Sequence, residues 1–344
     1  MSGSVRLSQR SSHLMSVARA CAALYVVIHH VALARDFPFP FSIFKHFGHQ
    51  AVIAFFLMSG FLIHANERHR VLREPARYAL RRGVRIYPAL IVALILSIVL
   101  VSGEWSYRDL IGNLLALQDT MATTPGTFVG TFKGNSPLWS LSYELWFYLL
   151  YPFIMMIFVR SIKLAHLAVG VTCVLSYTIY IIHPNHFLVM TAYFASWWAG
   201  AAVAEAYGSG KRDVRSMLLQ LLALTATCAV ATLPMLFRHG RPSEYPALQA
   251  NHLWSALLFT VAIFSPVGAY LAKFAKAVPV RLATTLASIS YGLYVFHWPI
   301  LVQWNVAQSD AGFAAAVVVL LAVSWLCDRE LSYRIAPLIK KRSS

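Results

Sequence analysis

Apolar runs of about 20 residues recur along the whole of this 344-residue chain, and they constrain its fold more than any other feature. A run of that length crosses the hydrocarbon core of a bilayer as a helix. Only 12% of the residues are charged, whereas a soluble domain carries roughly twice that fraction. Since backbone polar groups have to be satisfied within the bilayer, the runs are expected to be helical. The sequence therefore predicts an all-α, polytopic membrane helix bundle.

Ten spans are expected from the lengths of the apolar runs and the breakers between them. The apolar piece from Leu110 to Leu117 is too short to cross a bilayer, so we expect it to be re-entrant or interfacial. The first run contains Arg19, and no small-residue cleavage site follows it before Arg35, so it is expected to be a span and not a signal peptide. The membrane domain is predicted at 16–335, between cytoplasmic tails at 1–15 and 336–344. The ten spans lie near 16–34, 49–66, 84–102, 138–160, 164–182, 187–206, 215–237, 251–272, 282–304 and 311–334.

The basic residues lie mainly on one side of this map. Of the 29 Lys and Arg, 23 fall in or beside the tails and loops that ten spans place with the N-terminus. Because cytoplasmic loops carry an excess of Lys and Arg, both termini are expected in the cytoplasm. The net charge of +16 is then explained by the orientation of the chain in the membrane and by contact with anionic lipid, so no nucleic-acid partner is expected. The six basic residues on the other side are Arg35, Lys45, Arg108, Lys133, Arg238 and Arg241.

Ionisable groups inside the first predicted span are candidates for function, since a charge there is costly. Arg19 and His30 are 11 residues apart, which is three helical turns plus about 20°, so they share one face about 16 Å apart along the axis. A cation near the cytoplasmic end suits an anionic donor, and a deeper imidazole suits a general base. The alternative is that Arg19 reaches lipid phosphate and His30 is an ordinary core residue.

A second group of cations lies in RRGVRIYP, where the third predicted span begins. Arg82 and Arg85 are at positions i and i+3, on adjacent parts of one helix face. Guanidinium groups suit phosphates because each donates in a planar fork. The alternative is a basic loop that binds anionic lipid, which accounts less well for Arg85 because the apolar run follows it directly.

Two further spans carry polar groups of interest. Ser59 and Gly60 interrupt AVIAFFLMSGFLI, and small residues there allow a close helix approach, so packing alone is as good an explanation as lining a site. Glu144 lies among the aromatic residues of PLWSLSYELWFYLLYP and needs a partner. It is a candidate catalytic group that orients His30 or binds sugar hydroxyls, or it is a member of a structural ion pair.

The segment SISYGLYVFHWPIL places three candidate residues at successive steps of three. Tyr291, Tyr294 and His297 are expected to bind an acceptor or to support the site, and Pro299 is expected to break or kink the helix. Carbonyl groups freed near that proline need partners inside the protein. His297 therefore either binds acceptor or caps the kink.

No metal site is predicted. The four cysteines lie in or beside apolar segments without metal-ligand spacing, and we expect them to be small core residues. A metal-dependent enzyme is disfavoured because the histidines show no standard ligand spacing. The histidines considered as ligands were His29, His30, His183 and His186.

Five motifs together resemble the acyltransferase 3 family of membrane O-acyltransferases over about 16–335. The family's basic residue followed eleven positions later by histidine falls on Arg19 and His30, its paired arginines on Arg82 and Arg85, and its glutamate on Glu144. The motifs, in order, are ARACAALYVVIHH, FFLMSGFLI, RRGVRIYP, LWSLSYELWFYLLYP and SISYGLYVFHWP.

The resemblance implies acyl-CoA, usually acetyl-CoA, as a cytoplasmic co-substrate, with no permanently bound cofactor. It implies O-acylation of a sugar hydroxyl in a cell-surface polysaccharide, lipopolysaccharide or glycolipid at the bacterial inner membrane. Some members carry an extracytoplasmic hydrolase-like domain after the membrane domain. Without one, transfer is expected by direct attack or with a separate polysaccharide-assembly partner.

The alternative function is secondary transport of an anionic solute or glycolipid. Ten spans with buried charges suit a transporter as well as an enzyme. Transporters often show repeated halves with helices broken at matching positions. The sequence shows one clear break, at Pro299, and no second half that resembles the first.

Overall fold

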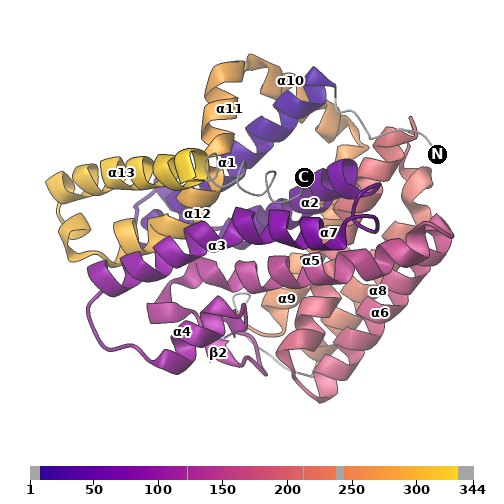
Figure 1. Cartoon of the computed structure of the whole chain (residues 1–344), viewed down its shortest axis with the longest axis horizontal. Helices are drawn as coiled ribbons and strands as arrows, with labels where there is room; N and C mark the ends of the chain where they lie inside the picture. The colour runs from indigo at the N-terminus through magenta and orange to yellow at the C-terminus, as the bar shows by residue number, and fades with distance from the viewer. Residues whose placement is uncertain (1–7, 122, 212, 238–243, 332–344) are drawn as a thin grey trace.

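The computed structural model describes residues 8–121, 123–211, 213–237 and 244–331, and it is a helical bundle (Figure 1). Within these residues, eight helical segments are long and apolar enough to cross a membrane. Arg238, Arg241 and the predicted C-terminal tail lie outside the described residues. The eight segments are α1 (Gln9–Ala34), α2 (Gly48–Glu67), α3 (Pro75–Leu100), Ser136–Phe158 with α5 (Trp139–Phe158), α6 (Ile162–Ile182), α7 (His186–Gly208), Val214–Leu236 with α8 (Leu218–Thr232), and Asp310–Glu330 with α13 (Asp310–Trp325).

Two bent helix pairs complete the bundle and bring the possible spans to ten. Helix α9 (Ala247–Ile263) meets α10 (Pro266–Ala277) at 77°. Helix α11 (Val280–Ser288) meets the continuous segment of α12 (Ser290–His297) and a π-helical turn (Trp298–Gln303) at 48°. The predicted number of spans therefore holds if each pair crosses once. The expected span 251–272, predicted as one helix, and the expected span 282–304, predicted to break or kink at Pro299, are both bent pairs.

The break in the second pair does not lie where the proline predicted it. The bend falls at Ile289, between α11 and α12, and the chain continues through Pro299 as the π-helical turn. Pro299 has no N–H to offer the carbonyl four residues earlier, that of Val295. The side-chain amide of Asn135 donates to that carbonyl instead, at 3.5 Å. The expectation that a freed carbonyl finds a partner inside the protein is thus confirmed.

Helix α7 is the most deeply buried of the candidate spans, and α2 packs closely along it. Both helices have a glycine where the backbones cross. A Cβ at Gly60 would lie 1.9 Å from the backbone oxygen of Trp197, and one at Gly200 would lie 1.9 Å from that of Leu57. Only glycine permits such an approach. Gly60 therefore allows the close packing of α2 against α7, as one of the two explanations of its motif predicts.

The connection from α3 to α5 carries the strands of the described region. The apolar piece expected at Leu110–Leu117 forms the short helix α4 (Tyr107–Leu114) and the turn after it. Strand β1 (Gln118–Asp119) then pairs in parallel with β2 (Val129–Gly130). The remaining short helical turns are Phe41–Lys45, Phe132–Gly134, Ser136–Leu138, Val214–Met217, Leu233–Leu236, Asn305–Gln308 and Leu326–Leu331.

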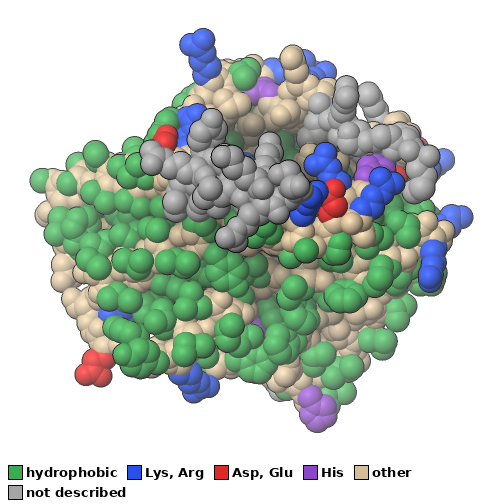
Figure 2. Space-filling view, in the orientation of Figure 1, with side chains coloured by type: hydrophobic (Ala, Val, Ile, Leu, Met, Phe, Trp, Pro, Cys, Tyr) green, Lys and Arg blue, Asp and Glu red, His purple; other side chains and the backbone are tan. Residues whose placement is uncertain are grey.

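The surface of the bundle fits a membrane protein. Figure 2 shows hydrophobic side chains over the broad middle of one face, with most of its charged side chains toward the edges. Large exposed apolar side chains occur on α3, α6, α8 and α13, where a soluble protein would place polar groups. The chain is therefore a multi-pass membrane protein.

Candidate active site

One large cavity, with a volume of about 400 Å³, lies between α1, α2, α3, α5 and α12. It brings together seven residues proposed from the sequence: Arg19, Ser59, Arg82, Arg85, Glu144, Tyr291 and Tyr294. Four arginines and one carboxylate line it beside aliphatic and aromatic groups. The other lining residues are Val52, Phe55, Phe56, Met58, Leu62, Ile63, Arg81, Ile86, Ser140, Leu141, Tyr148 and Ser290.

Two of the arginines are held by one buried carboxylate. Arg81 donates twice to Glu67, from Nε to Oε1 at 2.9 Å and from Nη2 to Oε2 at 2.7 Å. Arg82 donates from Nη2 to Glu67 Oε1 at 3.3 Å, while its Nε is buried without a hydrogen-bond partner. Glu67 was missed from the sequence because it is the one acid in a basic stretch, HANERHR, which reads as a solvated loop.

The third and fourth arginines approach the cavity from α3 and α1. Arg85 Nη1 lies 3.6 Å from Oδ1 of the buried Asp328, whose Oδ2 accepts the N–H of Gly292 at 2.8 Å. Arg19 donates to Ser290 Oγ at 3.1 Å. Among the described residues, no carboxylate oxygen lies within 4.0 Å of a side-chain nitrogen of Arg19. Its charge is thus the least compensated of the four, which suits an anionic ligand.

Glu144 is held on one side and lines the cavity. Its Oε1 accepts hydrogen bonds from Ser59 Oγ at 2.8 Å and from Tyr148 OH. Ser59 in turn accepts from Trp197 Nε1 at 3.3 Å. Ser59 therefore lines the site and is also the neighbour of Gly60 at the close crossing of α2 and α7. Both the packing and the lining explanation of this motif apply.

His30 and His297 form a pair outside the set of lining residues. His30 Nδ1 lies 2.9 Å from His297 Nε2, and the rings stack with centroids 5.1 Å apart. Tyr294 lines the cavity and packs against His297 with ring centroids 6.3 Å apart. The hydroxyl of Tyr294 is within hydrogen-bond distance of Ser140 Oγ and donates to the carbonyl of Pro137. Tyr294 therefore contacts both the cavity and the imidazole pair, whereas His30 does not line the cavity.

The contacts of His297 define which nitrogen of His30 holds the proton when both rings are neutral. His297 Nδ1 lies 3.1 Å from the carbonyl of Leu293, which can only accept, so this nitrogen carries the hydrogen. His297 Nε2 then accepts from Nδ1–H of His30. Nε2 of His30 is left with a lone pair. A neutral imidazole oriented in this way can take a proton from a hydroxyl group.

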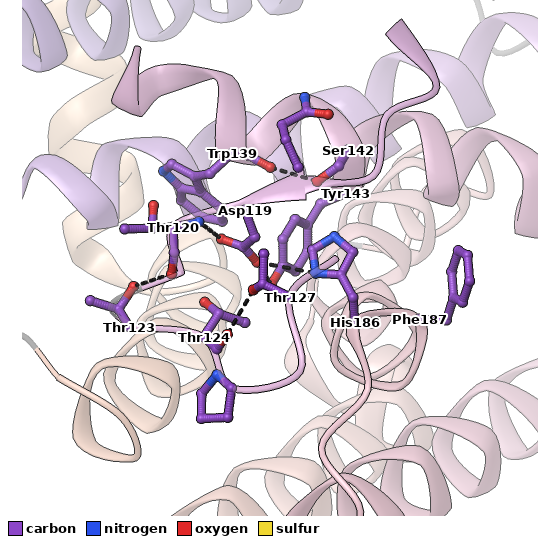
Figure 3. Close-up of polar contacts among 12 residues, drawn as sticks. Asp119, Thr120, Thr123, Thr124, Thr127, Trp139, Ser142, Tyr143, His186 and Phe187 are labelled. Carbon is purple, nitrogen blue, oxygen red and sulfur yellow. Dashed lines mark hydrogen bonds and ion pairs between the residues drawn. The ribbon is translucent and has the colours of Figure 1, made fainter. Parts of the chain in front are cut away.

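A second polar group surrounds Asp119, toward the end of the bundle where α2 begins. Figure 3 shows Asp119 between Tyr143 and His186 on one side and Thr120, Thr123 and Thr124 on the other. Tyr143 OH donates to Asp119 Oδ2 at 2.7 Å, and His186 Nδ1 lies 3.5 Å from the same oxygen. The N–H of Thr120 donates to Oδ1 at 2.6 Å.

The burial of Asp119 changes its ionisation. Removal of the carboxyl group from water raises its pKa from 3.8 to about 7, even though hydrogen bonds from Tyr143 and Thr120 favour the charged form. The carboxyl group therefore titrates near neutral pH. Sequence analysis missed Asp119 because it lies in an irregular connection with no motif around it.

The comparison with known families decides the class of protein. The family model for the acyltransferase 3 domain matches residues 14–329, almost the whole chain. The chain belongs to the acyltransferase 3 family. It is therefore a membrane acyltransferase. No curated protein and no solved structure matches this acyltransferase.

The described residues contain no group of three or more His, Cys, Asp or Glu side chains placed to hold a metal ion. None of the four cysteines forms a disulfide; Cys173, Cys228 and Cys327 are buried as expected, whereas Cys21 is exposed.

Proposed function

We propose that the protein is an O-acyltransferase that moves an acyl group, most simply acetyl, from cytoplasmic acyl-CoA to a sugar hydroxyl. The acceptor is a cell-surface polysaccharide or glycolipid, and the site of action is the bacterial inner membrane. The observation that carries the proposal is the convergence of four arginines and Glu144 on one cavity in an acyltransferase.

The arginine-lined part of the cavity would hold the CoA phosphates. Arg19, Arg82 and Arg85 each present a planar fork that suits phosphate oxygens. A volume of about 400 Å³ accommodates the narrow pantetheine arm but not the whole cofactor, so the nucleotide would remain at the mouth. The basic loop after α2 is predicted to be cytoplasmic, which places this mouth on the side where CoA occurs.

The reaction would take place at His30. Nε2 of His30 removes the proton from the attacking hydroxyl group, the hydroxyl oxygen forms a bond to the acyl carbon, and the carbon–sulfur bond breaks. The departing thiolate takes the proton back from the imidazolium ring and leaves as CoA thiol, so atoms and charges balance. His297 acts as a positioning residue that keeps Nδ1 of His30 protonated. Because His30 lies outside the lining residues, a side chain such as Tyr294 would have to move before the thioester reaches it.

Glu144 and the two tyrosines would support the reacting groups. Glu144 presents a carboxylate to the cavity from a fixed position, since Ser59 and Tyr148 both bind Oε1. Tyr291 donates to the carbonyl of Ile86, which fixes α12 against α3, and Arg85 lies over its ring at 5.2 Å. Glu144 is thus suited to contact substrate, whereas Tyr291 is suited to hold Arg85.

The first experiment is transfer from labelled acetyl-CoA by the purified protein in liposomes. The acceptor is surface polysaccharide from cells that lack the protein, stripped of O-acyl groups with mild alkali. We expect label in the polysaccharide from the wild type and a loss of about 10²–10⁴-fold in His30→Ala, the range of a general base. His183→Ala, which removes an exposed imidazole, is the matched control and should retain activity.

Two results would contradict the proposal. Full transfer by a correctly folded His30→Ala variant would remove His30 from the mechanism. If surface glycans were the same in cells with and without the protein, and liposomes that contain the protein showed solute flux, the transporter alternative would be favoured.

A further inference from the structure

A small second hollow lies toward the first turn of α2, away from the arginine-lined cavity. Its volume is about 20 Å³, close to that of a single water-sized group. Polar and aromatic side chains from α2, α5, α7, α9 and the α4–α5 connection surround it. The lining residues are His49, Asp119, Thr120, Thr123, Thr124, Trp139, Tyr143, Tyr193, Leu248, Gln249 and His252.

His252 supplies an unused hydrogen-bonding atom at this hollow. Its Nδ1 is engaged by Tyr193 OH at 2.8 Å. Its Nε2 is buried and has no hydrogen-bond partner among the described residues, and the residue as a whole is only 3% exposed. A buried polar atom without a partner is costly, and such atoms are uncommon in folded proteins. The position is therefore suited to a ligand that completes the hydrogen bond.

Two neighbouring rings pack against the His252 imidazole and restrict its orientation. The ring of His49 stacks on it with centroids 5.0 Å apart, and the indole of Trp139 stacks at 5.8 Å, tilted by 12°. The imidazole cannot turn its nitrogen elsewhere without losing these contacts. Nε2 is thus held in place before any ligand arrives, which lowers the entropic cost of binding.

A layer of rings separates this hollow from the arginine-lined cavity. Phe56 lines the cavity, and its ring packs against Trp139 at 6.1 Å and Tyr143 at 6.2 Å, both of which line the hollow. His49, beside the hollow, is within electrostatic range of His30. A group bound in the hollow would therefore lie beside His49, which connects the hollow electrostatically with His30.

We propose that this hollow is the anchoring subsite for the acceptor, where one hydroxyl group of a carbohydrate binds against Nε2 of His252. The proposal rests on the acyltransferase function given above. The lining suits a polyol ligand, because it combines two imidazoles, a carboxyl group, an amide and three threonine hydroxyl groups around a space for one oxygen atom. The anchored hydroxyl is not the one that is acylated. It holds the glycan while another of its hydroxyl groups is acylated.

The test compares Michaelis constants for the two substrates in liposomes. Labelled acetyl-CoA and alkali-treated surface polysaccharide are varied in turn. In His252→Leu the hydroxyl group loses its partner, so KM for the polysaccharide should rise by about tenfold or more while KM for acetyl-CoA stays unchanged. His252→Gln keeps a polar group at this position, and its KM for the polysaccharide should lie nearer the wild type.

His166→Leu is the matched control, because it also removes a buried imidazole, one that binds Trp198 Nε1 at 3.0 Å on a different helix. It should leave both constants unchanged. If His252→Leu fails to fold, Thr123→Val tests the same subsite, and it too should raise only the constant for the polysaccharide. An unchanged constant for the polysaccharide, or an equal rise for both substrates, would overturn the subsite. Absence of transfer by the wild type would instead overturn the proposed function.

Discussion

The crossing of α2 and α7 allows a stability prediction to be worked out from distances. In Gly60→Ala the new Cβ would lie 1.9 Å from the backbone oxygen of Trp197 and 2.9 Å from its carbonyl carbon. Ordinary contact begins at 3.4 Å, so the two backbones have to separate by about 1.5 Å. Neither atom belongs to a flexible side chain that can move aside. The strain therefore falls on the most buried helix of the bundle.

Overpacking of this kind costs about 1–3 kcal/mol, and we expect the upper part of that range because backbone has to move. At about 2–4 °C per kcal/mol, the apparent unfolding temperature of Gly60→Ala should fall by roughly 5 °C or more. The measurement is tryptophan fluorescence during heating in detergent. Since Ser59 is adjacent and holds Glu144, acyl transfer should fall as well.

Gly83→Ala is the matched control, because the nearest atom that its Cβ would meet is Tyr87 Cδ2 at 4.0 Å. An alanine is a better helix former than glycine, so this variant in α3 should be as stable as the wild type or more stable by up to about 1 kcal/mol. If Gly60→Ala unfolded at the same temperature as the wild type, the close crossing of the two backbones would be refuted.

Three further predictions follow from the charged groups. In the folded protein the pKa of Asp119 is raised to about 7, against 3.8 for the free group, so the folded state holds the proton more tightly than the unfolded state. The free energy of unfolding should therefore fall as the pH rises from about 4 to about 7. Denaturation at several pH values measures this slope, and Asp119→Asn should reduce it; an unchanged slope would contradict the assignment. Glu67→Gln leaves Arg81 and Arg82 without their shared carboxylate and should lower the free energy of unfolding by about 3 kcal/mol. The unfolding temperature measures this change, and an unchanged temperature would contradict the prediction. Arg82→Gln should weaken CoA binding by about tenfold in calorimetry, whereas Arg35→Gln, which removes the partner of an exposed carboxylate, should not; equal affinities would remove Arg82 from the donor site.

Apolar length was sufficient to predict the helix bundle and most of its spans. The bend between α9 and α10 had a local signal that was overlooked. Ser265 caps α10 by accepting the N–H of Val267, and Pro266 occupies the first turn. Serine followed by proline is a common start of a helix. Hydropathy alone cannot show it, because a helix that restarts at an angle has the same composition as a straight one.

The bend before α12 had no local signal. The free N–H of Gly292 in the first turn of α12 is satisfied by Asp328, 36 residues later in the chain. A Cβ at Gly292 would lie 2.8 Å from the Cα of Ser324, so α13 also determines how closely α12 can pack. Long-range capping of this kind depends on the tertiary fold. The sequence signal at Pro299 marks the change from α12 to the π-helical turn, whereas the 48° bend lies before α12.

The charged residues of the site could be predicted from the sequence. Arg19 and Glu144 were singled out by the cost of a charge in the membrane, and Arg82 and Arg85 by their spacing at the start of a span; the structure places all four on one cavity. The pairing of His30 with His297 was not predictable, since 267 residues separate them. Buried groups such as Asp328 and His252 have no neighbouring motif, so only the packed bundle reveals what they contact.

The ring layer of Phe56, Trp139 and Tyr143 bears on how well the membrane keeps an ion gradient. A bundle with polar hollows toward both of its ends would dissipate an ion gradient if a continuous file of water joined them. The contacts among these rings place apolar groups between the two polar hollows. Such a layer would hinder a water file and would therefore limit the passage of protons through the bundle.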